Sequence, residues 1–136
     1  MSAIQAATLY VGLNITILFV LIVLVIRQRR LHKCVIGDGG HKSLILAIRA
    51  HANAVEVMPM ALIGLVALAS TGVIPLGIHV LGAALTLGRG LHAYGLSNNE
   101  GPSFGRMAGM ALSLLSLIGI AIACSGAAFF RIGLRG

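Results

Sequence analysis

The chain has 136 residues, of which 58% are hydrophobic and only 10% are charged. A soluble domain carries about 25% charged residues, so this composition excludes a water-soluble protein and predicts one membrane domain over residues 1–136. The formal net charge of +7 comes from clustered basic residues without interleaved aromatic residues. This pattern argues against a nucleic-acid partner and favours contact with anionic lipid headgroups.

Four apolar stretches predict transmembrane helices at about residues 4–27, 42–70, 74–96 and 104–130. Each is long enough to cross about 30 Å of hydrocarbon, so the expected fold is an all-α bundle of four transmembrane helices. The first stretch is too long for a signal peptide and its basic cluster follows it, so we expect a retained helix. Four short helices that carry charges inside the membrane rarely seal a site alone, which predicts an oligomer.

The connections between these helices predict the orientation in the membrane. Basic residues gather at the first and third connections: Arg27, Arg29, Arg30, Lys33, Lys42 and Arg106. The opposite side carries Arg131 and Arg135. The positive-inside rule therefore places the first and third connections in the cytoplasm and both termini on the other side.

The second predicted helix carries a polar cluster inside its apolar run. At 100° per residue, Arg49, Asn53 and Glu56 lie within roughly 60° of one another. Charged side chains at membrane depth cost about 2.5–3.5 kcal/mol each, so they are usually paired or functional. This face would bind a carboxylate and accept an ammonium group, which favours a zwitterionic ligand that resembles an amino acid. The alternatives are a snorkelling Arg49 and a structural ion pair of Glu56 with Arg49 or Arg89.

The third helix and the start of the fourth add more polar residues. Arg89 and His92 are i, i+3 neighbours near the same end, and Arg106 opens the fourth helix from that side. Each could be an interfacial anchor, but together they predict a positive pocket for an anionic, peptide-like cofactor. An arginine beside a thiol would favour the nucleophilic thiolate. His51 lies about 160° from the Arg49 face and is expected to bond a neighbouring helix or subunit.

A metal site is not expected, because Arg49 and Arg89 would oppose a divalent cation. His51 and Glu56 also lack the i, i+4 spacing of a helical zinc site.

The chain resembles the MAPEG family, the membrane-associated proteins in eicosanoid and glutathione metabolism. The segment Arg49-Ala50-His51-x-Asn53-x-x-Glu56-x-x-Pro59 is similar to the second-helix motif of its prostaglandin E synthase branch. The resemblance also rests on the third-helix run Gly88-Arg89-x-x-His92, on Arg27-x-Arg29, and on the run Gly37-Asp38-Gly39-Gly40, which is typical of bacterial members. It implies a homotrimer in a bacterial inner membrane, with glutathione bound at each subunit interface.

The resemblance also implies a role for each residue. Glutathione would be bound by six residues of one chain and one of its neighbour: Arg49, His51, Asn53, Glu56, Arg89 and His92, with Arg27 from the neighbouring subunit. Arg106 would stabilise the thiolate. The chain departs from characterised relatives where it has Val57, Leu96 and Met107 in place of tyrosine, tyrosine and serine.

The expected function is a glutathione transferase or peroxidase that acts on lipophilic electrophiles or hydroperoxides. Two alternatives stay open at this point. One is a small four-helix exporter that couples transport to Glu56, and the other is a non-catalytic family member that binds lipid or glutathione.

Overall fold

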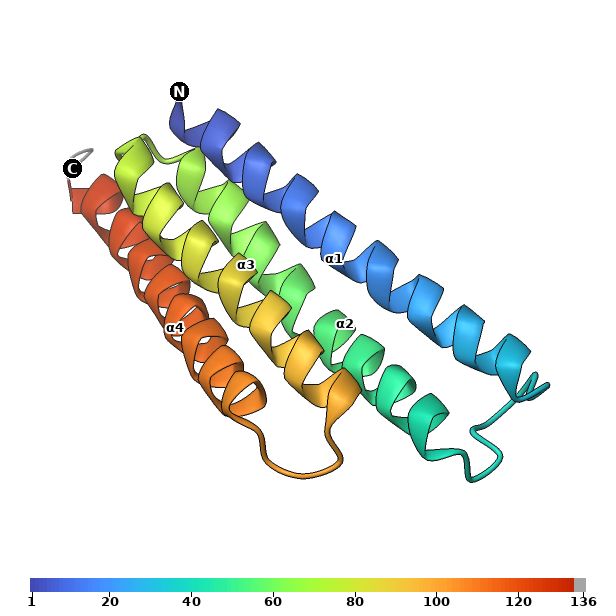
Figure 1. Ribbon diagram of the computed structural model, residues 1–136. Coiled ribbons are helices and arrows are strands. Elements are labelled where there is room, and N and C mark those ends of the chain that lie inside the picture. The colour runs from blue at the N-terminus through green and yellow to red at the C-terminus, as the bar shows by residue number, and fades with distance from the viewer. Residues whose placement is uncertain (134–136) are drawn as a thin grey trace.

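The computed structural model describes residues 1–133, with side chains through residue 129. Four helices follow one another: α1 (Ala3–Leu31), α2 (Lys42–Ala69), α3 (Pro75–Asn98) and α4 (Phe104–Gly133). They run alternately up and down, so that the α1–α2 and α3–α4 connections lie at one end of the bundle (Figure 1). The N-terminus and the α2–α3 connection lie at the other end. The four predicted helices are therefore present, each with its bounds within four residues of those expected.

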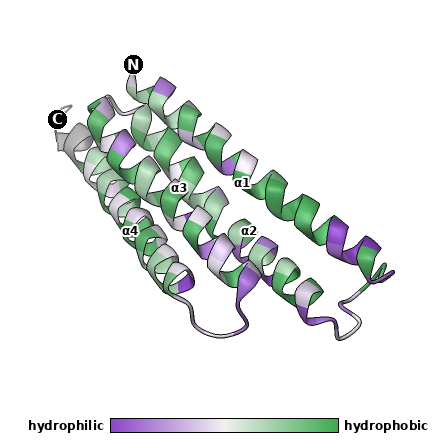
Figure 2. Cartoon of the chain, in the orientation of Figure 1, coloured by the Kyte–Doolittle hydropathy of each residue, from purple (hydrophilic) through white to green (hydrophobic). Residues whose placement is uncertain are grey.

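Three of the four helices in the described part are long and apolar enough to cross a membrane: α1, α2 and Phe104–Phe129 of α4. The prediction of four spanning helices is supported for these three only. Although α3 has 24 residues, it includes five glycines and the polar residues His79, Arg89 and His92. These residues lower its hydropathy. Hydrophilic residues gather at the end that carries the α1–α2 and α3–α4 connections (Figure 2).

Local sequence signals explain where the helices begin and end. Ser2 and Gln5 form a reciprocal capping box at the start of α1, which satisfies two orphan backbone donors. Gly72 adopts a φ of +85°, which glycine tolerates without strain, and Pro75 occupies the first turn of α3. Arg29 Nη1 donates hydrogen bonds to the carbonyl groups of residues 34, 35 and 37. Arg29 therefore also organises the α1–α2 connection.

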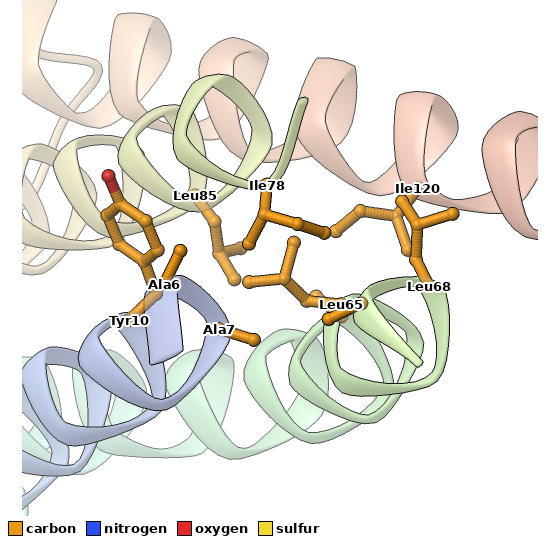
Figure 3. Close-up of a cluster of buried hydrophobic side chains, with 10 residues drawn as sticks. Ala6, Ala7, Tyr10, Leu65, Leu68, Ile78, Leu85 and Ile120 are labelled. Carbon is orange, nitrogen blue, oxygen red and sulfur yellow. The ribbon is translucent and has the colours of Figure 1, made fainter. Parts of the chain in front are cut away.

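All four helices contribute to a core at the end that carries the N-terminus (Figure 3). Its side chains are mainly small or branched: Ala6, Ala7, Tyr10, Leu65, Leu68, Ile78, Leu85 and Ile120. Polar contacts join α1 to α3 beside this core. The Tyr10 hydroxyl lies 2.9 Å from His79 Nδ1, and Asn14 Nδ2 donates to Thr86 Oγ1 at 2.8 Å. The polar site described next lies at the opposite end.

Candidate functional site

A groove of about 710 Å³ lies between α2, α3 and α4, beside the α3–α4 connection. Its polar lining consists of five residues: Arg49, Asn53, His92, Glu100 and Arg106. The rest of the lining is apolar: Ile45, Leu46, Leu96, Met107, Met110, Ala111 and Leu114. The groove therefore combines two guanidinium groups, one carboxylate, one carboxamide and one imidazole with a wall of aliphatic and methionine side chains.

Hydrogen bonds of Arg89 hold together the three helices that form this groove. Arg89 Nη1 donates to Asn53 Oδ1 at 2.9 Å, and Arg89 Nε donates to Ser113 Oγ at 3.0 Å. Ser113 in turn donates to the carbonyl of Gly109 at 2.7 Å. The Arg89 side chain thus links α2, α3 and α4, and it sets the position of the Asn53 carboxamide that lines the groove. Arg89 itself is only 2% exposed and does not line the groove.

His92 reaches the groove from α3 and is 3% exposed. Neither of its ring nitrogens has a hydrogen-bond partner within the described residues, and the same holds for Arg89 Nη2. Buried polar atoms are normally satisfied, so a ligand or water is the expected partner. Gly109 allows α4 to pack this closely against α3, because an added Cβ would collide with the His92 backbone nitrogen and lie 2.6 Å from the Gly88 carbonyl oxygen.

The first turn of α4 positions Arg106. Ser103 lies just before the helix, and its Oγ accepts a hydrogen bond from the Arg106 N–H at 3.3 Å. Its carbonyl accepts from the Met107 N–H at 3.0 Å. The half-buried Arg106 therefore lies at a capped helix N-terminus, where its guanidinium and the helix dipole both favour an anion.

Glu100 comes to the groove from the α3–α4 connection. Its Oε2 lies 3.2 Å from Lys42 Nζ at the start of α2. Both side chains are largely exposed, and such pairs contribute little to stability, about 0–1 kcal/mol. A positively charged ligand group could therefore take the place of Lys42 at low cost.

The structure brings together four of the residues that the sequence predicts for the site: Arg49, Asn53, His92 and Arg106. Arg89 lies behind them. Three further predicted residues do not line the groove within one chain: Arg27, His51 and Glu56. Arg27 is on α1, whose backbone packs on α2 and α3 but, within the described residues, not on α4.

Position along the helix explains why Glu56 is separate from the groove. The α2 lining runs from Ile45 to Asn53. Glu56 lies only about 20° from Arg49 around the helix, but it is seven residues, or about 10 Å, further along the axis, and it is exposed. Within the described residues it forms no ion pair, so the pairing with Arg49 or Arg89 that the sequence left open is absent from the single chain.

Sequence reasoning missed four residues that shape the site: Glu100, Ser103, Ser113 and Met110. Ser103 could have been found, because a serine at the start of a helix is a standard N-cap signal. Glu100 is one of only three acidic residues in the chain, and this rarity could have marked it as a candidate site residue. Ser113 and Met110 carry no comparable signal, since both are ordinary residues of an apolar helix. The described residues contain no group of three or more His, Cys, Asp or Glu side chains that could hold a metal ion.

Comparison with known proteins places the chain in a family. The MAPEG family model matches residues 7–126, a range that includes the whole groove. Inner membrane protein YecN of Escherichia coli K12 is 34% identical over 91 residues, which cover 67% of this chain and 70% of YecN. YecN of E. coli O6:H1 strain CFT073 gives the same values. No solved structure matches the chain. Because the family match extends over most of its length, this four-helix membrane protein belongs to the MAPEG family.

Proposed function

We propose that the chain is a glutathione-dependent membrane enzyme. It binds glutathione in the groove and activates the thiol for conjugation to lipophilic electrophiles or for reduction of hydroperoxides. The observation that carries this proposal is the convergence of Arg49, Asn53, His92 and Arg106, from three helices, on one groove of about 710 Å³. That volume lies within the range of about 300–1,000 Å³ that is usual for small-molecule sites.

The residues of the groove fit the chemistry of glutathione. This tripeptide carries two carboxylates, one ammonium group and one thiol. The guanidinium groups of Arg49 and Arg106 suit anionic groups, and the Glu100 carboxylate suits the ammonium group. The unpartnered ring nitrogens of His92 offer a further donor or acceptor inside the groove.

Arg106 is the residue that activates the thiol. A nearby guanidinium and a helix N-terminus both stabilise a thiolate relative to the thiol, and Arg106 lies where both act. Glutathione supplies the sulfur nucleophile when it is bound. Met107, Met110 and Leu114 form the apolar wall beside Arg106, which suits a lipophilic second substrate. Leu96 and Met107, at the positions where the family resemblance implies tyrosine and serine, are apolar and also line the groove.

The proposed active form is a homotrimer, in which Glu56 and His51 lie at subunit contacts and Arg27 of a neighbouring copy completes the site. Glu56 supports this arrangement, because it is exposed in the single chain although it lies near the middle of a spanning helix. A carboxylate there costs roughly 2.5–3.5 kcal/mol if lipid surrounds it. The similarity to inner membrane protein YecN supports an inner-membrane location. The basic residues at the α1–α2 and α3–α4 connections favour a cytoplasmic position for these connections.

The proposal is tested by titrating the purified protein with glutathione and following both the binding heat and the ultraviolet absorbance of the thiolate. We expect the wild type to bind glutathione and to develop the thiolate signal. Arg106→Ala should lose that signal and retain weakened binding. The control is Lys33→Asn, which also removes a cation at this end, and asparagine tolerates the positive φ of 51° there. If the wild type binds no glutathione, the enzyme proposal is wrong.

The groove does not favour the exporter hypothesis. A carboxylate that couples protons to transport should line the substrate path, whereas Glu56 lies outside the groove.

A further inference from the structure

A second groove, of about 300 Å³, lies between α1 and α3. Its α3 lining includes Gly90, Ala93 and Ser97. The α3 residues that line the groove with Arg106 are His92 and Leu96, which lie on a different face of α3. Its wall is apolar, with Ile17, Val20, Leu21 and Leu24 from α1 and Gly90 and Ala93 from α3. None of the residues assigned to glutathione binding lines it.

The length and orientation of this groove match one leaflet of a bilayer. Its α1 lining begins at Thr16 and ends at Leu24, which corresponds to about 12 Å at 1.5 Å per residue. One leaflet contributes about 15 Å of hydrocarbon, half of the usual 30 Å. The groove ends near the C-termini of α1 and α3, the end that carries the basic connection. An acyl chain would therefore lie in it with its headgroup at that surface.

The end of the groove nearest the membrane surface has buried polar atoms without hydrogen-bond partners in the described part of the chain. Ser97 lines it, and the buried Ser97 Oγ has no hydrogen-bond partner within the described residues. Gln28, one turn beyond Leu24 on α1, likewise has a buried and unpartnered Oε1. A hydroxyl donor at this depth suits the ester carbonyl that joins an acyl chain to its glycerol.

Basic side chains lie beyond this polar end. Arg27 follows Val20 by seven residues and Thr16 by eleven, so it lies on the same face of α1 as these groove residues. Arg30 lies three residues further. Both side chains are exposed, and neither forms a hydrogen bond or ion pair with the described part of the chain. Because two arginines lie beyond the polar end of the groove, one cation remains there even if the Arg27 side chain turns toward a neighbouring subunit.

We propose that the α1–α3 groove is a binding site for an anionic phospholipid. One acyl chain lies along Ile17, Val20 and Leu24, the Ser97 hydroxyl donates to an ester carbonyl, and the phosphate lies at Arg27 and Arg30. A lipid with a zwitterionic headgroup fits the same groove but gains less from two cations. This site does not depend on the proposed glutathione chemistry.

The absence of tryptophan from the chain allows a direct test. Tyr94→Trp places one fluorescent reporter in the groove lining, and Phe19→Trp places one on α1 outside it. Both positions are exposed, at 72% and 63%, and each change replaces one aromatic ring with another. Each protein is reconstituted in phosphatidylcholine vesicles that contain a minor fraction of brominated phosphatidylglycerol or, in parallel, brominated phosphatidylcholine. Contact with bromine quenches the fluorescence.

We expect the groove reporter, introduced by Tyr94→Trp, to be quenched more by the anionic lipid than by the zwitterionic one. The outer reporter, introduced by Phe19→Trp, should be quenched equally by both. In the Tyr94→Trp background, Arg27→Ala with Arg30→Ala should lower the relative affinity for anionic lipid roughly tenfold. Gly90→Leu should abolish the preference by filling the groove, since nothing lies within 4 Å of a Cβ at this position. Circular dichroism checks that each variant folds.

Two results would overturn the proposal. Equal quenching of both reporters by both lipids would mean that only ordinary boundary lipid surrounds the protein. A preference for anionic lipid that survives Gly90→Leu would place the lipid somewhere other than in the groove.

Discussion

Arg89 is the buried residue on which the geometry of the larger groove depends. Its guanidinium bonds Asn53 on one side and Ser113 on the other, so three helices share one charged group. A hydrogen bond to a charged group is worth about 1.5–3 kcal/mol, and an orphaned buried partner costs more than the bond contributed. Arg89 therefore acts on a ligand through Asn53.

This arrangement predicts the effect of Ser113→Ala. The change leaves the Arg89 Nε–H without an acceptor in a fully buried place and should lower the free energy of unfolding by about 1–3 kcal/mol. Glutathione affinity should fall as well, because Arg89 is then held less firmly and no longer fixes the position of the Asn53 carboxamide. Thermal unfolding in detergent measures the first effect and calorimetry the second. Ser125→Ala, an exposed serine on the same helix, is the control and should change neither quantity.

At the scale of elements, the contact between α3 and α4 brings His92 and Arg106 to one groove. Glycines allow the two backbones to approach closely at this level. An added Cβ on Gly95 would collide with the Arg106 backbone nitrogen, and one on Gly88 would lie 2.8 Å from the Ser113 backbone nitrogen. Backbone atoms cannot move aside as a side-chain end can, so the helices themselves would have to separate.

Gly109→Ala tests this contact. We expect a loss of about 1–3 kcal/mol in unfolding free energy from overpacking, together with weaker glutathione binding as His92 and Arg106 move apart. Gly126→Ala on the same helix meets nothing within 4 Å and should stabilise the protein by up to about 1 kcal/mol, the helix preference of alanine over glycine. Melting temperatures of the two variants, compared with the wild type, distinguish the outcomes. Equal changes in melting temperature would show that the close approach of α3 and α4 at Gly109 is unimportant for stability.

At the scale of the whole molecule, exposure of polar residues on spanning helices points to an assembly. The proposed trimer predicts a native mass of three times the 14.0 kDa of one chain. If Glu56 pairs with a cation of a neighbouring copy, Glu56→Gln should weaken the assembly by roughly 3–5 kcal/mol per buried pair. Native mass spectrometry in increasing detergent measures this change. Glu100→Gln, at the mouth of the groove, should leave the assembly intact, and an unaffected Glu56→Gln trimer would argue that Glu56 faces lipid.

Sequence reasoning predicted the helices well because long apolar runs leave few alternatives in a membrane. It also predicted that Arg49, Asn53, His92 and Arg106 converge, since helices that alternate in direction bring their polar ends to one side. It did not separate Arg89 from the groove residues. A helical face defines direction but not depth, and only packing against Ser113 determines that Arg89 is buried. Glu56 shares a face with Arg49 on a helical wheel, yet it lies about 10 Å further along α2, beyond the part of the helix that lines the groove.

The bonds of Arg89 have a consequence for how the chain enters the membrane. Helix α3 is too polar to qualify as a spanning segment by itself, and an arginine at membrane depth adds about 2.5–3.5 kcal/mol to its transfer. One acceptor for that arginine, Asn53, has been synthesised before α3, but the other, Ser113, follows it in α4. The third helix is therefore fully stabilised in the bilayer only after ribosomal synthesis has reached the fourth. We therefore expect the last two helices to enter the membrane as a pair.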